Sequence, residues 1–135
     1  MPHLVRVHAS HCRWAWWFGN GQGGLFSAQL LLLHPSHYDS VLNHTWNAGR
    51  HAPGVTLTLG FDAPVTTLKL CPNMKPAEGF VGLVVVLESG QRIAHRTLWR
   101  ESEWVTVAIP TPASELLIEF MESPSWIALH AVDMS

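Results

Sequence analysis

An aromatic cluster followed by a glycine-rich segment is the most unusual stretch of the sequence. Trp14, Trp16, Trp17 and Phe18 stand almost side by side, and residues 19–24 read GNGQGG. Sugar rings stack their C–H faces on aromatic rings, so a sugar site needs an apolar wall and a few polar groups. Adjacent strand residues point to opposite faces, so at least one ring should be exposed. We predict Trp17 as a ligand-binding residue; the alternative is that each ring fills the core or an interface.

A second candidate for chemistry is the pair Arg50 and His51, which follows Gly49. An arginine presents five donors in a fixed fork that can bind sugar hydroxyls or a carboxylate, and a histidine adds both a donor and an acceptor. Binding residues are commonly found on loops that a rigid scaffold positions. We therefore predict Arg50 and His51 as ligand-binding residues; a solvated turn is the alternative.

Metal and catalytic chemistry have little support in the sequence. The histidines at 34 and 37 with Asp39, and those at 8 and 11 with Cys12, lack the paired spacing of known zinc modules. The sequence contains no nucleophile elbow, phosphate-binding loop or His-Glu-x-x-His motif. We predict a protein that is not an enzyme, with no metal site and no cofactor.

The elements that must position these residues read as β-strands. Glycine and proline signals recur about every eight to twelve residues, as in an all-β sandwich. Val55, Leu57 and Leu59 alternate with threonines, which places one apolar face inward. We predict a jelly-roll β-sandwich of eight or nine strands. They come from the segments Leu4–Ala9, Leu25–Leu33, Leu42–Trp46, Val55–Leu59, Thr67–Cys71, Phe80–Leu87, Ile93–Trp99, Trp104–Ile109, Glu115–Met121 and Trp126–Val132, one of which is a loop.

Four residues are expected to set the local geometry of this sandwich. Trp46 should fill the core with its large ring. Gly49 should permit the tight turn that follows. Gly60 should end its strand through a positive φ, and Pro64 should then keep the connection out of the sheet.

Size and composition place limits on the function. A chain of 135 residues predicts one domain, residues 1–135, and its 47% hydrophobic content excludes a disordered protein. The formal net charge of -2 argues against nucleic-acid binding. Only 13% of the residues are charged and seven are tryptophans, which favours a buried face larger than a small domain needs.

The cysteines and the apolar runs indicate little about location. Cys12 and Cys71 could form one bridge, but two buried thiols are the simpler interpretation. No apolar run approaches the roughly 20 residues that a membrane helix needs. The start of the sequence lacks the apolar stretch of a signal peptide. We therefore expect a cytoplasmic protein, or one that is exported without such a peptide.

The segment from Trp46 to Gly79 resembles the discoidin family, also called factor 5/8 type C domains, and the related galactose-binding-like modules. The resemblance lies in Thr45-Trp46 with Gly49, the strand VTLTL followed by Gly60, and the closing strand that starts at Trp126. It implies a jelly-roll sandwich that recognises ligands with loops at one end. The family's calcium-binding stretch is replaced here by Ser40–Thr45, which has no carboxylate, and calcium prefers carboxylates among its ligands.

Together these patterns predict a non-catalytic glycan-binding module that uses Trp17, Arg50 and His51. The alternative is a protein-interaction module that forms part of a homo-oligomer or larger complex. Its partner would be a glycan or a protein, and not a nucleic acid.

The lack of a carboxylate before Trp46 generates the first prediction. A bound metal would stabilise the folded state by mass action, and its removal would lower the melting temperature. Since we expect no metal site, a chelator such as EDTA should leave the melting temperature unchanged. Differential scanning fluorimetry with and without chelator measures this. A drop of several degrees would contradict the prediction.

Overall fold

The computed structural model describes residues 2–12, 28–32, 46–74 and 77–135. Apart from one short 3-10 helix, η2, the regular elements of this part of the chain are seven β-strands. In order they are β1 (Leu4–Ala9), η2 (Ala28–Leu32), β2 (Trp46–Asn47), β3 (Val55–Pro72), β4 (Gly79–Leu87), β5 (Arg92–Trp99), β6 (Val105–Glu122) and β7 (Ala128–Met134).

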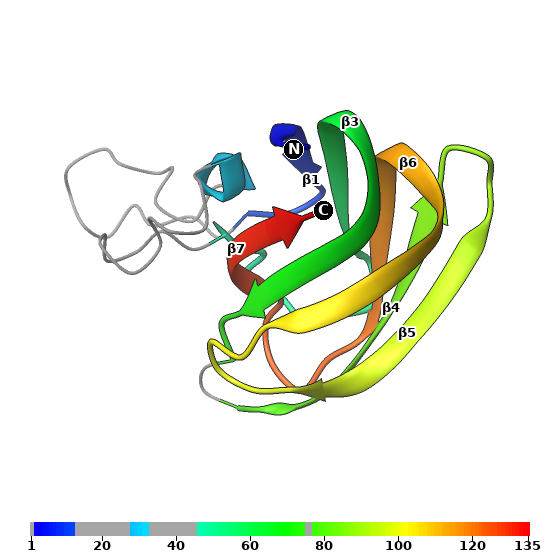
Figure 1. Cartoon of the computed structure of the whole chain (residues 1–135). Helices are drawn as coiled ribbons and strands as arrows, with labels where there is room; N and C mark the ends of the chain where they lie inside the picture. Colours follow the sequence, from blue (N-terminus) through cyan, green and yellow to red (C-terminus); the bar gives the residue numbers. More distant parts are fainter. Residues whose placement is uncertain (1, 13–27, 33–45, 75–76) are drawn as a thin grey trace, which may run out of the picture.

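Two strands of 18 residues, β3 and β6, run through both layers of the fold. They pair antiparallel from Val55 opposite Phe120 to Leu70 opposite Val105, with register shifts between Gly60 and Thr67. Both ribbons curve over at the top of Figure 1. The first half of β3 and the second half of β6 therefore lie in one layer, and their other halves lie in the second layer.

Shorter strands complete each layer. In the first layer, β1 pairs with the first half of β3, and β4 pairs with the second half of β6 and with β5. In the second layer, β7 pairs with the second half of β3 and carries β2 on its other side. The fold is therefore an all-β sandwich in which all of these pairings are antiparallel.

The core lies between the two layers and follows the period-two pattern of the strands. Trp46 is fully buried, as predicted, and its ring lies 6.2 Å from that of Phe120. Trp99 meets the same phenylalanine edge-on at 6.2 Å. Three large rings from β2, β5 and β6 thus meet in the core, where each contributes a large buried apolar surface.

The strand count differs from the prediction because two predicted turns do not interrupt the sheet. The segments predicted as Val55–Leu59 and Thr67–Cys71 are one strand, β3, and those predicted as Trp104–Ile109 and Glu115–Met121 are one strand, β6. Gly60 does not end its strand: it lies inside β3, and its φ is not among the positive ones. Pro64 also lies within β3.

Other local predictions agree with the structure. Gly49 has a φ of 73° in the turn after β2, as expected for its tight turn. The β4–β5 hairpin forms around Gly90, with a φ of 91°. The segment predicted with least support, Leu25–Leu33, contains the 3-10 helix Ala28–Leu32, while most of Leu42–Trp46 lies outside the described residues.

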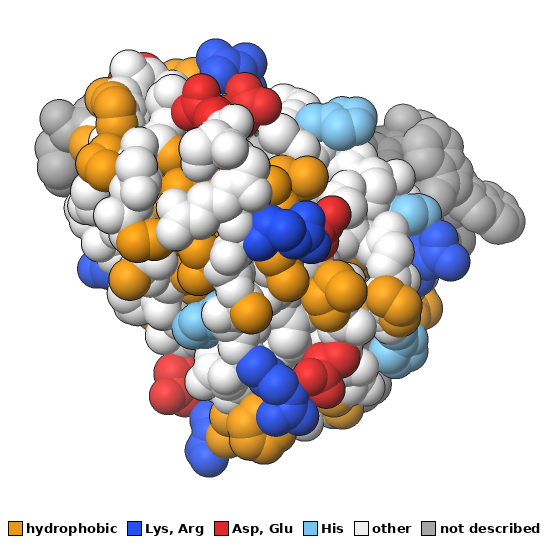
Figure 2. Space-filling model, turned by 90° about the vertical axis from the view of Figure 1, so that its right-hand side faces the viewer, with side chains coloured by type: hydrophobic (Ala, Val, Ile, Leu, Met, Phe, Trp, Pro, Cys, Tyr) orange, Lys and Arg blue, Asp and Glu red, His pale blue; other side chains and the backbone are white. Residues whose placement is uncertain are grey.

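The outer face of β4 and β5 mixes apolar and charged side chains. Figure 2 shows hydrophobic groups on this side of the molecule, interrupted by neighbouring basic and acidic groups. Phe80, Leu98 and Met121 are exposed. The Arg96 guanidinium lies 4.5 Å from the centre of the Phe80 ring and is ion-paired with Glu122. The charged pairs divide the apolar surface into small areas.

A carboxylate in the connection between β5 and β6 links it to β7 and to the segment after β3. Glu101, between β5 and β6, accepts a hydrogen bond of 2.8 Å from the His130 ring on β7 and one of 2.7 Å from the Met74 amide after β3. Burial alone would raise the pKa of Glu101, but hydrogen bonds from His130, Ser102 and Met74 outweigh it and hold the pKa below its ordinary value.

This lowered pKa predicts an acid-sensitive junction. A carboxyl group with a depressed pKa stabilises the folded state above its unfolded pKa and loses that contribution as the pH falls through the folded value. Glu101→Gln should therefore lower the free energy of unfolding at neutral pH, and its difference from wild type should shrink between about pH 5 and about pH 3. Urea unfolding at several pH values measures this. A difference that is constant with pH would contradict it.

Candidate functional site

The loop after β2 holds Arg50 in place at one end of the sandwich. The Asn47 carboxamide oxygen accepts a hydrogen bond of 2.8 Å from the Gly49 amide and closes the turn. The Arg50 carbonyl accepts a bond of 3.1 Å from the Ile127 amide, and the Ile127 carbonyl accepts one of 2.8 Å from Ala48. The backbone of this loop is therefore tied to the segment that leads into β7.

His11, which follows β1, meets Arg50 across this end. The buried Trp46 donates a hydrogen bond of 3.0 Å from its indole Nε1 to the His11 carbonyl. The Arg50 Nη1 lies 2.7 Å from the His11 Nε2. A guanidinium can only donate, so in this contact His11 is the neutral acceptor. The contact orients the arginine and leaves its other donors available.

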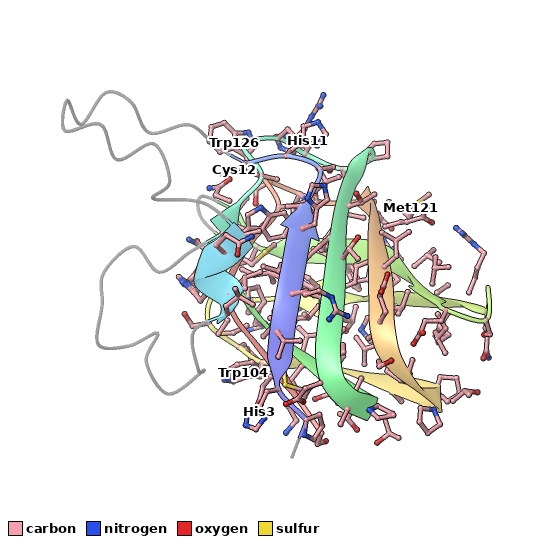
Figure 3. All side chains as sticks on the ribbon, turned by 90° about the horizontal axis from the view of Figure 1, so that it is seen from above. His3, His11, Cys12, Trp104, Met121 and Trp126 are labelled. Carbon is pink, nitrogen blue, oxygen red and sulfur yellow. The ribbon has the colours of Figure 1, made fainter. Side chains whose placement is uncertain are left out.

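An aromatic side chain lies beside this pair. Trp126 precedes Ile127, whose backbone bonds to Arg50, and its side chain is 39% exposed. Figure 3 shows His11, Cys12 and Trp126 together at one end of the molecule, and His3 and Trp104 at the opposite end. An exposed indole beside a guanidinium and an imidazole combines an apolar surface with hydrogen-bonding groups, which suits a polyhydroxylated ring.

The structure describes part of the site predicted from the sequence. Arg50 and His51 are both exposed in the predicted loop. Trp17, like Trp14 and Trp16, lies outside the described residues, so its role stays a prediction.

The sequence does not predict two further residues at this end, His11 and Trp126, as ligand-binding residues. The sequence pattern places Trp126 in the closing strand, whereas β7 begins at Ala128. The preceding Pro124 and Ser125 form a turn signal that could have placed Trp126 before that strand. His11 gave no local signal, because its contact with Arg50 joins residues 39 apart in the sequence.

The two cysteines have different environments. Cys71 is a buried thiol, as expected, whereas Cys12 is an exposed thiol beside His11. Partial burial still raises the pKa of the Cys12 thiol. Within the described ranges, no three His, Cys, Asp or Glu side chains are arranged to hold a metal ion.

Comparison with known proteins identifies the fold. No protein-family model matches the chain, and no curated protein sequence does. The CBM32 module of AlyQ, solved in complex with 4,5-unsaturated mannuronic acid, has a TM-score of 0.59 at 15% identity, covering 100% of this chain and 98% of that one. A Streptococcus pneumoniae fucose-binding module, SpX-3, gives 0.64 at 9% identity, with 96% and 92% covered.

A third similar structure is the lectin domain of lectinolysin complexed with Lewis B antigen, with a TM-score of 0.61 at 12% identity, covering 96% of this chain and 91% of that one. The chain also matches SpGH29 and truncated AlyQ, but spans only 26% and 32% of their lengths. It therefore shares the β-sandwich fold of the three modules. In the described residues, no helix is long and apolar enough to cross a membrane.

The difference between the cysteines provides a chemical probe of this end. In the native protein, a thiol reagent should modify Cys12 and not Cys71, and slowly at neutral pH because the raised pKa leaves little thiolate. Mass spectrometry after brief iodoacetamide treatment measures this. Cys12→Ser should remove the native modification, and rapid labelling of Cys71 would contradict the structure.

Proposed function

We propose that the protein is a non-catalytic glycan-binding module. The proposed site lies at one end of the sandwich and consists of His11, Arg50, His51 and Trp126. The carrying observation is the Arg50–His11 contact of 2.7 Å beside an indole that is 39% exposed. The guanidinium and imidazole supply hydrogen bonds to hydroxyls, and the indole supplies a face for the C–H groups of a sugar ring.

The electrostatics of this end indicate which glycans to test. Arg50 is always cationic. A carboxylate on a sugar would therefore bind favourably through the paired donors of Arg50. Both neutral sugars and uronic acids fit this chemistry, and the test must include both.

Similar structures support the proposal. The three modules described above were solved with, or named for, carbohydrate ligands: an unsaturated mannuronic acid, fucose and the Lewis B antigen. In each case, more than nine-tenths of that domain is covered by this chain. Trp17 stays a predicted sugar-stacking residue on the evidence of the sequence alone.

Substitution of the site residues tests the proposal. Arg50→Ala and Trp126→Ala should abolish binding to the glycan that the wild type selects on an array, because they remove the fork and the stacking face. Arg50 is exposed, so its substitution should change the free energy of unfolding by no more than about 0.5 kcal/mol. Calorimetry should start at millimolar ligand, where binding is worth about 4 kcal/mol.

Trp104→Ala is the matched control. Its side chain is 37% exposed, close to the value for Trp126, but it lies at the opposite end of the molecule. The control should retain glycan binding. Equal loss of glycan binding in all three variants, or no glycan bound by the wild type, would contradict the proposal.

Assembly into an oligomer stays a prediction from the sequence. Sedimentation of the wild-type protein tests it.

A further inference from the structure

We infer a second ligand site on the outer face of β1, β3 and β6, where a neutral sugar or similar polyol binds between Arg6 and Glu115. These three strands lie side by side in Figure 3. A hollow of about 440 Å³ opens on this face, within the size range of small-molecule sites. Its lining includes Arg6, His8, Thr58 and Glu115.

Gly60 determines where the arginine lies. The strand register places Arg6 opposite Gly60 and Gly60 opposite Glu115, so a glycine separates the two charged residues across the sheet. A Cβ at Gly60 would lie 2.6 Å from Arg6 Nη2, 2.8 Å from Nε and 2.9 Å from Cζ. The guanidinium thus occupies the space that a side chain at position 60 would take.

The charged groups of the hollow do not pair with each other. In the part of the chain that the structure describes, Arg6 forms no ion pair or hydrogen bond, and the Glu115 carboxylate forms none either. The hollow is therefore lined by a charged donor group from β1, Arg6, and by a charged acceptor group from β6, Glu115. A hydroxyl both donates and accepts, so adjacent hydroxyls can bridge a guanidinium and a carboxylate that do not touch.

The charge balance selects the class of ligand. An anion would be attracted by Arg6 and repelled by Glu115, and a cation would experience the reverse. Thr58 and His8 lie opposite each other, two residues along the strands from Gly60 and Arg6, and add polar groups. The exposed Val5 supplies an apolar wall. This combination favours an uncharged, hydroxyl-rich ring, whereas the positive charge at the loop end also accepts carboxylates. The second site does not depend on the proposed function of that end.

Gly60→Ala tests the role of the glycine without removing any charged group. The added methyl should displace the Arg6 guanidinium, which is the flexible end of a long side chain, so the variant should fold. The probes are the neutral methyl glycosides of galactose, glucose, mannose and fucose, followed by NMR of the Arg6 Nε–H and of the Thr58 and Glu115 amides. At least one glycoside should shift these signals in wild type, and Gly60→Ala should weaken its affinity at least tenfold.

Two further variants separate the sites. Arg6→Lys keeps the charge but loses the fork, and should weaken the same glycoside even if Gly60→Ala fails to fold. Trp126→Ala alters only the loop end and should leave the Arg6 shifts intact. The inference is overturned if no glycoside moves the signals of Arg6, Thr58 and Glu115, or if Gly60→Ala or Arg6→Lys binds as tightly as wild type. Loss of the Arg6 shifts in Trp126→Ala would likewise overturn a separate site.

Discussion

The continuous pairing of β3 with β6 is the constraint on which the rest of the structure depends. Because the two strands stay hydrogen-bonded through their bend, each supplies half of one layer and half of the other. The layers therefore cannot slide past one another without breaking the ladder. The alternation of side chains carries the apolar face of β3 inward in both halves, so that Leu57 and Leu70 are both fully buried. β1, β4 and β7 pair directly with this folded ribbon, and β2 and β5 are added at the outer edges of β7 and β4.

Three connections meet at one end of the sandwich: the segment after β1, the loop after β2 and the connection from β6 to β7. Backbone bonds between Arg50 and Ile127 and the indole bond from Trp46 to His11 fix their positions. A loop held by such bonds loses less conformational entropy when it binds a ligand. The site therefore owes its order to the core as much as to its own residues.

The sequence was sufficient to predict the layers but not the site. The period-two pattern in β3, β4 and β6 is a local signal and identified an all-β sandwich correctly. The prediction that Gly60 ends its strand was wrong, because a glycine at a strand end and a glycine beneath a neighbouring side chain look alike in sequence. Arg50 could be selected because it follows a turn signal. His11 could not be selected from the sequence, because only the tertiary fold brings it to Arg50. Trp126 could not be selected because its apolar neighbours place it in the pattern of the closing strand.

The glycines of this chain show how one residue type serves two physical roles. Gly49, Gly54 and Gly90 have positive φ values and make turns that other residues would strain. Gly60 has no such conformation, and its value lies in the absent side chain, which allows a guanidinium to approach the strand closely. Glycine inside a strand costs some stability, and Arg6 has no ion-pair or hydrogen-bond partner in the described chain. The proposed second site would give the close approach of Arg6 to the strand a role in binding.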